Sequence, residues 1–417
     1  MTDRREMSHL LRRVTFGPTS AEVDAAVRSG VEQTVTTLLA PATPINLPDI
    51  GPEPSVTAGG DRAARQQARQ AQQKQVTAAL DWWLGRMAAD RTGAEKLVFF
   101  WHGHWATSAQ KVRSAHLMLG QQQTFRRYGP GDTGALIRAM LRDPALIIWL
   151  DGQKNTRKAP NENLARELME LFTLGVGNYS EDDVKAGARV LTGWVVDKAT
   201  GKATLKPARH DDGTVTLLGR TGTFDVDAYA DLLTRNEHHL PFLAQRHWVR
   251  YGSGAAPSAA ATGRIVAAGR TGSALLRAVL TDPEFPATDG QLVKQPIEWL
   301  IGAVRQLGID VSKVKAPAVL RSLGQVPFRP PSVGGWPVGD AWLTTSSTEA
   351  RIRTGQALAA QAEQATDRLT GSDRLDALAD LLVVDGWSDR TRAALSGIKD
   401  PRRLLALGLA SPEYAVH

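Results

Sequence analysis

Residues 160–172 of the chain read Pro-Asn-Glu-Asn-Leu-Ala-Arg-Glu-Leu-Met-Glu-Leu-Phe. On an α-helix, at about 100° per residue, the apolar side chains of this stretch cover one half of the surface. The polar side chains lie on the opposite half within an arc of about 100°, and they are Asn163, Arg166, Glu167 and Glu170. The stretch therefore predicts an amphipathic helix over residues 161–174.

The same helical period continues through most of the 417 residues. It predicts further helices over residues 21–39, 61–90, 94–108, 112–128, 132–142 and 181–191. Ser180 stands directly before the last of these helices and is a typical N-cap residue. Helical periodicity returns at Val226 and dominates the rest of the chain.

Three segments depart from the helical pattern. Near residues 194–222, short runs of strand-forming residues alternate with turn residues. Residues 41–60 and residues 324–342 are rich in proline and glycine and are predicted to be loops. No internal repeat or linker divides the chain. We therefore predict a mainly α fold, a single large helical unit over residues 1–417 with a small β-hairpin insert near residues 194–222.

The composition limits the chemistry and the location of the protein. No cysteine occurs, which excludes disulfides, thiolate zinc sites and a cysteine nucleophile. The shares of 42% hydrophobic and 22% charged residues are those of an ordinary globular protein. The N-terminus lacks the apolar run of about 7–15 residues of a signal peptide, and no run of about 18 apolar residues could span a membrane. We therefore expect a soluble, cytoplasmic protein.

The formal net charge of +7 gives little further information about partners. The densest basic stretch, residues 62–74, is rich in glutamine and alanine and is strongly helix-forming. It lacks the aromatic residues that interleave with arginine in single-strand binders. We interpret it as a solvated helix face, so nucleic acid is not an expected partner.

The polar arc of the 161–174 helix has two readings. If it faces solvent, Arg166 and Glu170 form an ordinary surface pair at i,i+4. If it faces inward, Glu167 and Glu170 would form an acid–base pair, with one carboxyl kept protonated by an apolar wall. Arg166 would then bind an anion or hold a carboxylate. The amides of Asn161 and Asn163 would contact the substrate.

A second candidate segment holds two histidines among aromatic residues, at His102 and His104. On a helix, their rings point about 200° apart, so convergence requires the helix to break at Gly103. One reading makes them hydrogen-bonded core residues. In the other they shuttle protons or, together with Glu167, bind a divalent metal.

Two further groups could contribute to a site. His210 and Asp211 are adjacent, so the carboxylate could orient the imidazole, or both could serve an Asx-type turn. Trp336 and Trp342 stand in the glycine-rich part of the 324–342 loop. They could form a stacking platform for a sugar, or they could pack the loop onto the helical core.

Several common catalytic signatures are missing from the sequence. It contains no G-x-S-x-G elbow, no P-loop, no H-E-x-x-H and no G-x-G-x-x-G that opens a helix. Their absence argues against a standard hydrolase, an NTPase, a zincin or a dinucleotide-dependent enzyme.

Taken together, these segments resemble a bacterial family catalogued as domain of unknown function 1800. The matching motifs lie at residues 9–19, 100–108, 142–145, 161–175, 188–194 and 333–342. The family pattern has Asn where this chain has Gly103, usually Phe at the position of Trp105, and in some relatives His at the position of Phe172. The resemblance implies a shared fold without a settled reaction. It favours the inward orientation of the polar arc, because the family signature includes the polar residues.

We therefore predict an enzyme with an inward-facing His/Glu/Arg cleft and hydrolytic chemistry on a small molecule or a saccharide. In one version of the site, His102, His104 and Glu167 hold a divalent metal. Trp194, which belongs to the family-like motifs, would wall the cleft together with Trp336 and Trp342. A first alternative is a non-enzymatic helical scaffold that binds a polyanion or a partner protein. A second is a carbohydrate-binding or carbohydrate-processing protein.

Overall fold

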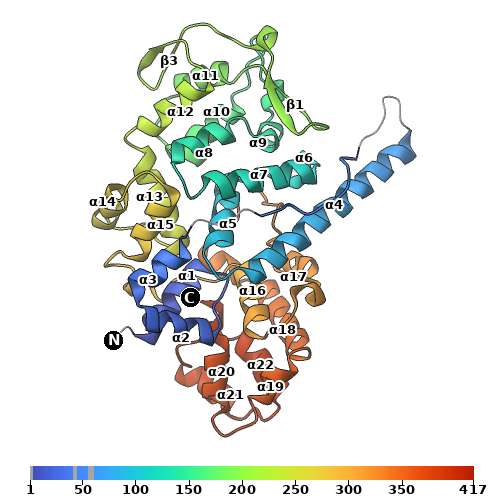
Figure 1. Ribbon diagram of the computed structural model, residues 1–417, viewed down its shortest axis with the longest axis vertical. Helices are drawn as coiled ribbons and strands as arrows, with labels where there is room; N and C mark the ends of the chain where they lie inside the picture. Colours follow the sequence, from blue (N-terminus) through green and yellow to red (C-terminus); the bar gives the residue numbers. More distant parts are fainter. Residues whose placement is uncertain (1–2, 41–44, 55–60) are drawn as a thin grey trace.

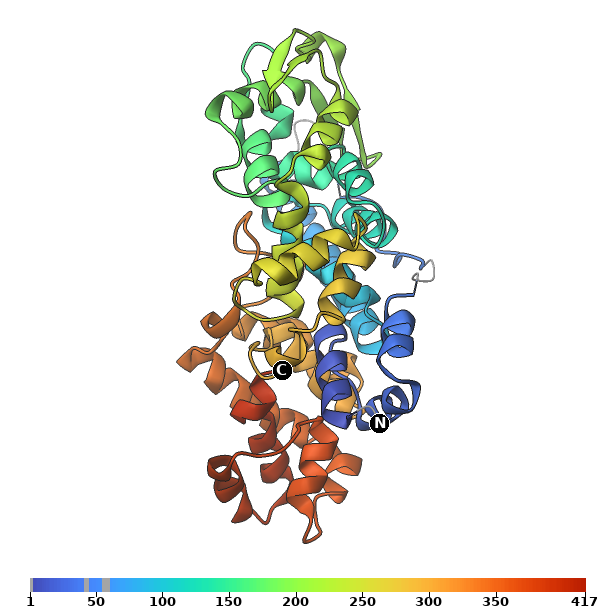
Figure 2. The ribbon, with the colours of Figure 1, turned by 90° about the vertical axis from the view of Figure 1, so that its left-hand side faces the viewer.

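Helices make up most of the protein, and only short strands accompany them (Figure 1). The structure, a computed structural model, describes residues 3–40, 45–54 and 61–417. Figures 1 and 2 show the helices stacked along one long axis, with the strands at one end and the last helices of the chain at the other. This arrangement confirms the mainly α fold class.

The middle of the molecule combines N-terminal helices with helices from far along the chain. They are α1 (Arg4–Val14), α2 (Ser20–Ser29), α3 (Val31–Leu38), α4 (Arg62–Ala89), α5 (Ala94–His104), α13 (His239–Tyr251), α14 (Ala259–Ala267), α15 (Gly272–Leu280) and α16 (Pro296–Gln306). Nearly every side chain of α5 is buried, so this helix lies at the centre of the core. It ends at His104 and not at residue 108 as predicted.

The end of the molecule that carries the strands is built around further helices. They are α6 (Ala109–Val112), α7 (Ala115–Tyr128), α8 (Thr133–Met140), α9 (Pro144–Trp149), α10 (Asn163–Glu167), the π-helical turn η2 (Leu168–Thr173), α11 (Glu181–Val190) and α12 (Val226–Arg235). Ser180 caps α11, as predicted, in a capping box with Asp183.

The predicted β-hairpin insert is confirmed, in the form of two separate antiparallel hairpins. In the first, β1 (Trp194–Asp197) pairs with β2 (Lys202–Leu205). In the second, β3 (Val215–Leu217) pairs with β4 (Arg220–Gly222). Short 3-10 turns lie near them at η1 (Gly152–Lys154) and η3 (Pro207–Arg209).

The opposite end of the molecule contains the last helices of the chain. They are α17 (Ala316–Ser322), α18 (Thr345–Ala359), α19 (Glu363–Asp367), α20 (Arg374–Leu382), α21 (Asp389–Ser396), α22 (Pro401–Leu409) and α23 (Pro412–Ala415). Between α17 and α18, the loop at residues 324–342 contains only the 3-10 turn η6 (Gly339–Trp342). Two more 3-10 turns are η4 (Pro286–Thr288) and η5 (Val311–Val314).

Two further sequence predictions concern the loop at residues 41–60 and the lack of membrane-spanning segments. The predicted loop at residues 41–60 has neither helix nor strand at residues 45–54, and its other residues lie outside the described residues. Within the described parts of the chain, no helix is both long and apolar enough to cross a membrane.

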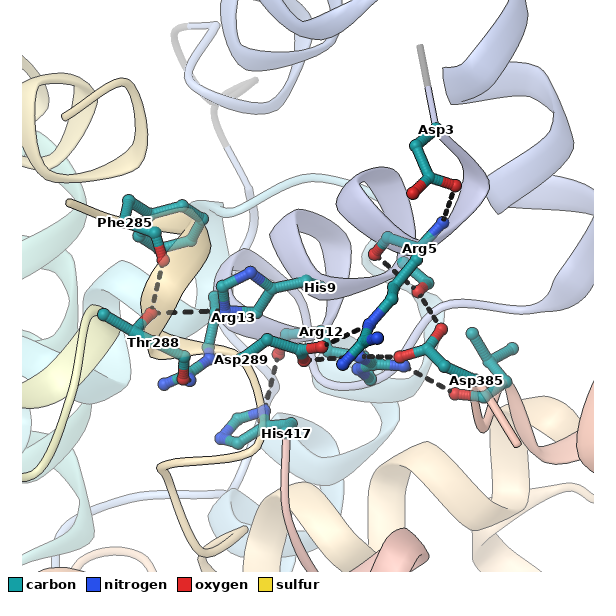
Figure 3. Close-up of polar contacts among 12 residues, drawn as sticks. Asp3, Arg5, His9, Arg12, Arg13, Phe285, Thr288, Asp289, Asp385 and His417 are labelled. Carbon is teal, nitrogen blue, oxygen red and sulfur yellow. Dashed lines mark hydrogen bonds and ion pairs between the residues drawn. The ribbon is translucent and has the colours of Figure 1, made fainter. Parts of the chain in front are cut away.

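The first helix holds distant segments together through its arginines (Figure 3). Arg12 forms ion pairs with Asp289 at 3.1 Å and Asp385 at 2.6 Å. The fully buried Arg13 donates hydrogen bonds to the carbonyl oxygens of Gly252 and Thr288. Helix α1 therefore contacts segments more than 200 positions away in sequence, which explains why basic residues lie in the core.

A buried ion cluster lies beside this contact. The Lys96 ammonium, with no exposed surface, lies 2.7 Å from Glu298 and also donates to the carbonyl oxygens of Arg12 and Thr15. Arg250 is the second cation on the same carboxylate, at 2.9 Å. The cluster thus joins α1, α5, α13 and α16 through a single acidic side chain.

Candidate functional site

The predicted 161–174 helix forms as α10 followed by the π-helical turn η2. In a π turn the backbone bonds span five residues, and the amide of Leu174 accordingly donates to the carbonyl of Met169 at 2.9 Å. Histidines satisfy two carbonyls at the end of the turn: His104 Nε2 donates to Phe172 at 2.9 Å, and His239 Nδ1 donates to Thr173 at 3.1 Å. Isolated π turns occur often at functional sites, which makes this turn a candidate position for one.

The bond from His104 fixes the tautomer of its ring. Because a carbonyl can only accept, Nε2 carries the proton and Nδ1 has a free lone pair. That Nδ1 is buried without a hydrogen-bond partner. Burial, reinforced by the charge of Arg246, holds the pKa of His104 well below its usual range. The ring is therefore neutral and offers an acceptor beside a cation.

A cleft of about 580 Å³ opens between the π turn and α13. Its volume lies within the range typical of small-molecule sites, about 300–1,000 Å³. Gly175 lets the two walls approach, because it has φ +85° and a Cβ there would stand 3.0 Å from Phe242. The polar side chains that line the cleft are His104, Glu170, Asn178, His238, Gln245, Arg246 and Thr262.

Two of these side chains are charged in opposite senses and have different surroundings. Glu170 accepts a hydrogen bond from the hydroxyl of Tyr179 at 2.5 Å. Burial and this bond raise the pKa of Tyr179 to about 12, so the hydroxyl remains a donor. Arg246 is half-buried, its Nε has no hydrogen-bond partner, and no carboxylate of the described residues pairs with it. Burial lowers the pKa of this guanidinium.

A narrower extension of about 60 Å³ continues along α5 to the 324–342 loop. Here the backbone of the loop comes directly against the backbone of the helix: a Cβ at Gly335, where φ is +85°, would stand 2.4 Å from the carbonyl oxygen of Gly103. Next to it, Trp336 stacks on Phe99 with ring centroids 5.3 Å apart. The loop thus forms the far wall of the cleft.

The polar residues of the 161–174 helix do not share one environment. Arg166 faces outward and pairs with Glu162 at 3.0 Å and with Glu181 at 2.7 Å. The solvent-facing reading therefore holds for Arg166, and the inward reading holds for Glu170, which lines the cleft. Glu167 is half-buried between them, and its pKa is raised by burial and by the charge of Glu170.

The two predicted amides stand apart from the cleft lining. Asn163 is exposed, and its backbone amide donates to the side chain of Asn161 at 3.1 Å. The backbone amide of Asn161 in turn donates to the side chain of Asn155 at 2.9 Å. These residues shape the start of α10.

His102 is a core residue, as one reading of the sequence proposed. Its Nε2 accepts from the backbone amide of Phe328 at 3.0 Å, and the rings of Trp83 and Trp336 pack edge-on against it. Burial lowers its pKa to about 3. His102 and His104 therefore carry their protons on opposite ring nitrogens and bind different parts of the chain.

The prediction that His102, His104 and Glu167 hold a divalent metal is wrong. Among the described residues, no group of three or more His, Asp or Glu side chains is placed to hold a metal ion. The reason is geometric, because α5 continues through Gly103 and the rings of His102 and His104 keep their helical separation. Glu167 does not join either ring.

The His210–Asp211 turn serves the local fold. Asp211 pairs with Arg189 at 2.7 Å and accepts from the amide of Gly213 at 3.0 Å, which is an Asx-type turn. His210 Nδ1 bonds to the carbonyl of Thr192 at 3.0 Å. The second reading of this pair therefore holds, and neither residue lines the cleft.

The tryptophans do not form an exposed platform. Trp342 has only 4% of its surface exposed, and Trp336 is half-buried against Phe99. Trp194, at 9%, lies at the start of β1 and outside the cleft lining. Of the three, Trp336 alone contributes a wall, in the narrow extension.

The sequence prediction missed Arg246 and His238. His238 stands directly before α13, which begins at His239. Nothing in the spacing along α13 marks Arg246 as the arginine without a partner. That property depends on which carboxylates the fold brings near it.

The whole arrangement can be compared with known proteins. A family model described as "Protein of unknown function (DUF1800)" matches residues 9–416. The chain belongs to this family. The searches of curated proteins and of solved structures found no match. The DUF1800 match covers every element that forms the cleft, from α5 to the 324–342 loop.

Proposed function

We propose that this DUF1800 protein is a hydrolytic enzyme and that its active site is the cleft between η2 and α13. The observation that carries the proposal is the lining of the cleft. It holds a carboxylate at Glu170, an imidazole at His238, and an unpaired guanidinium at Arg246. This lining supports a His/Glu/Arg site that uses Arg246 and His238, which differ from the arginine and the histidines named from the sequence.

Hydrolysis would require one base and one acid at this site. Glu170, held as an acceptor by Tyr179, takes a proton from a water molecule whose oxygen bonds to the electrophilic carbon of the substrate. The bond to the leaving group breaks, and His238 gives the leaving group a proton. The proton on Glu170 then returns to His238 through solvent. We assign Glu167 a weaker part, because it does not line the cleft.

The test is hydrolysis of a panel of 4-nitrophenyl esters and 4-nitroanilides by the wild type and by Glu170→Gln. Glutamine keeps the shape and cannot take the proton, so kcat/KM should fall by about 100-fold or more. The matched control is Glu167→Gln, one turn earlier on the same helix, for which we expect less than a tenfold change. Wild-type rates in Glu170→Gln, or no hydrolysis of any member of the panel by the wild type, would contradict the proposal.

A second candidate function, binding of a polyanion, is supported by the exposure of α4. Arg62, Arg65 and Arg69 are exposed and fall on one face of this helix. Figure 1 shows the first half of α4 extending away from the other helices. No ion pair with another described residue occupies these arginines, so their charge is free to meet an extended anion.

This candidate predicts retention on heparin. Changing Arg62, Arg65 and Arg69 together to glutamine should weaken binding on the order of tenfold at moderate salt, because three counterion-releasing contacts are lost. The matched control changes three exposed arginines at the other end of the molecule, Arg390, Arg402 and Arg403. Equal elution of both triple variants would rule out α4 as the binding surface.

A further inference from the structure

Within the described parts of the chain, Arg246 lacks the carboxylate partner that Arg250 and Arg12 have. Arg250, one turn further along α13, lies 2.9 Å from Glu298, and Arg12 pairs with Asp289 and Asp385. Arg246 has no such carboxylate among the described residues, and its Nε is out of contact with solvent. A guanidinium that is partly shielded from water and has no counter-ion is less stable than a paired one. A ligand that carries a negative group would supply the missing partner.

The walls around Arg246 show what the rest of that ligand must be. The larger apolar side chains of the lining are Leu171, Leu174, Val176, Pro241, Phe242 and Pro257. Val176 has 75% of its surface exposed, although it is a large hydrophobic residue. An apolar wall that is left open to solvent at the rim of a cleft favours a ligand with an apolar part.

The charges in the cleft limit the negative group to a single charge. Arg246 is the one arginine or lysine among the residues that line the cleft, and His104 is neutral because its pKa is lowered. Glu170 already contributes one negative charge. A phosphate dianion would meet a single guanidinium and the carboxylate of Glu170, whereas a carboxylate matches the guanidinium fork with one charge and two oxygens.

We propose that Arg246 binds the carboxylate of a substrate whose apolar substituent lies along the Leu171–Phe242 wall. This inference rests on the proposed function, because it places that carboxylate in the same cleft as Glu170. Arg246 would then set the substrate class as apolar carboxylic acids that carry a hydrolysable bond. The free Nδ1 lone pair of His104 would accept a hydrogen bond from an N–H or O–H group beside the carboxylate.

The experiment is calorimetric titration with 4-phenylbutyrate as the probe, against the neutral 4-phenylbutanol and against phenyl phosphate. The wild type should bind 4-phenylbutyrate at least tenfold more tightly than the other two. Arg246→Gln should weaken 4-phenylbutyrate at least tenfold and leave 4-phenylbutanol unchanged, and Arg246→Lys should lie between. The control is Arg28→Gln, an exposed arginine on α2 that should bind like the wild type.

A thermal melt of each variant guards against loss of folding. Because Arg246 has no partner to lose, its variants should melt at the wild-type temperature. If Arg246→Gln does not fold, the Arg246→Lys variant tests whether Arg246 binds the carboxylate. The measure is then its ratio of 4-phenylbutyrate to 4-phenylbutanol affinity. Equal binding of the acid and the alcohol by the wild type, equal acid binding by Arg246→Gln, or preference for phenyl phosphate would overturn the inference.

The outcomes separate this inference from the proposed function. Loss of hydrolysis in Glu170→Gln with unchanged 4-phenylbutyrate affinity supports both. If the wild type prefers 4-phenylbutyrate to 4-phenylbutanol but hydrolyses no member of the panel, Arg246 remains a carboxylate site and the proposed enzymatic function is rejected. If hydrolysis depends on Glu170 but the wild type shows no preference for carboxylates, only the inference about Arg246 is rejected.

Discussion

Replacing Glu298 with glutamine is expected to lower the free energy of unfolding by about 3–5 kcal/mol. The reason is that one buried carboxylate compensates several cations. Lys96 and Arg250 bind it directly at 2.7 and 2.9 Å, and their charges keep the pKa of Glu298 well below its usual range despite burial. Without that charge, both cations would remain buried and uncompensated. Denaturant unfolding followed by tryptophan fluorescence measures the change.

Two variants test this asymmetry. Lys96→Met should cost less than Glu298→Gln, because Arg250 still neutralises the carboxylate and because burial lowers the pKa of Lys96 to about 7. Asp182→Asn, whose side chain is 92% exposed, should change stability by no more than about 0.5 kcal/mol. If Glu298→Gln were as mild as Asp182→Asn, the cluster would not be held by its single acid.

Mild acid is expected to unfold the protein between about pH 6 and pH 4. Burial lowers the pKa of His9 and His102 to about 3 and that of His239 and His247 to about 4. In the unfolded chain their pKa values return to about 6.5. Below that value the unfolded state binds more protons. The contribution of these histidines to stability is therefore fully present above about pH 6.5 and is lost as the pH falls toward 3–4.

The size of this effect follows from the number of groups. Each histidine contributes a slope of about 1.4 kcal/mol per pH unit, so four give about 5 kcal/mol per unit. A native stability of about 5–15 kcal/mol is then consumed within about one to three units. Circular dichroism along a pH titration measures the midpoint. Replacing the exposed His238 with glutamine should leave the midpoint unchanged, and a native spectrum at pH 3 would refute the expectation.

The fold could be predicted from the sequence where local signals and burial agree. Ser180 caps α11, and the apolar half of residues 161–174 packs inward, because both depend on neighbours within a few positions. The strand pattern near residues 194–222 was readable for the same reason. The π turn was not, because an extra residue within a helical run leaves the polar and apolar composition unchanged.

The candidate site was predicted only in part, because its properties arise from distant contacts. Glu170 could be found because it shares a helix face with other polar residues. The different roles of His102 and His104 depend on Phe328 and Phe172, which lie 226 and 68 positions away. The lack of a carboxylate partner at Arg246 depends on where the fold places the acidic side chains of other segments. Such properties belong to the assembled fold and leave no trace in local spacing.

The backbone contact between Gly103 and Gly335 fixes the position of the 324–342 loop. The side chains at the rim of the cleft are not needed for this contact. Val338, on this loop, is 48% exposed and lines the narrow extension, while Val176 is 75% exposed and lines the main cleft. Neither side chain holds its own segment in place. A combinatorial library at these two positions could therefore redirect ligand preference while the scaffold keeps its stability, which makes this cleft a convenient starting point for protein engineering.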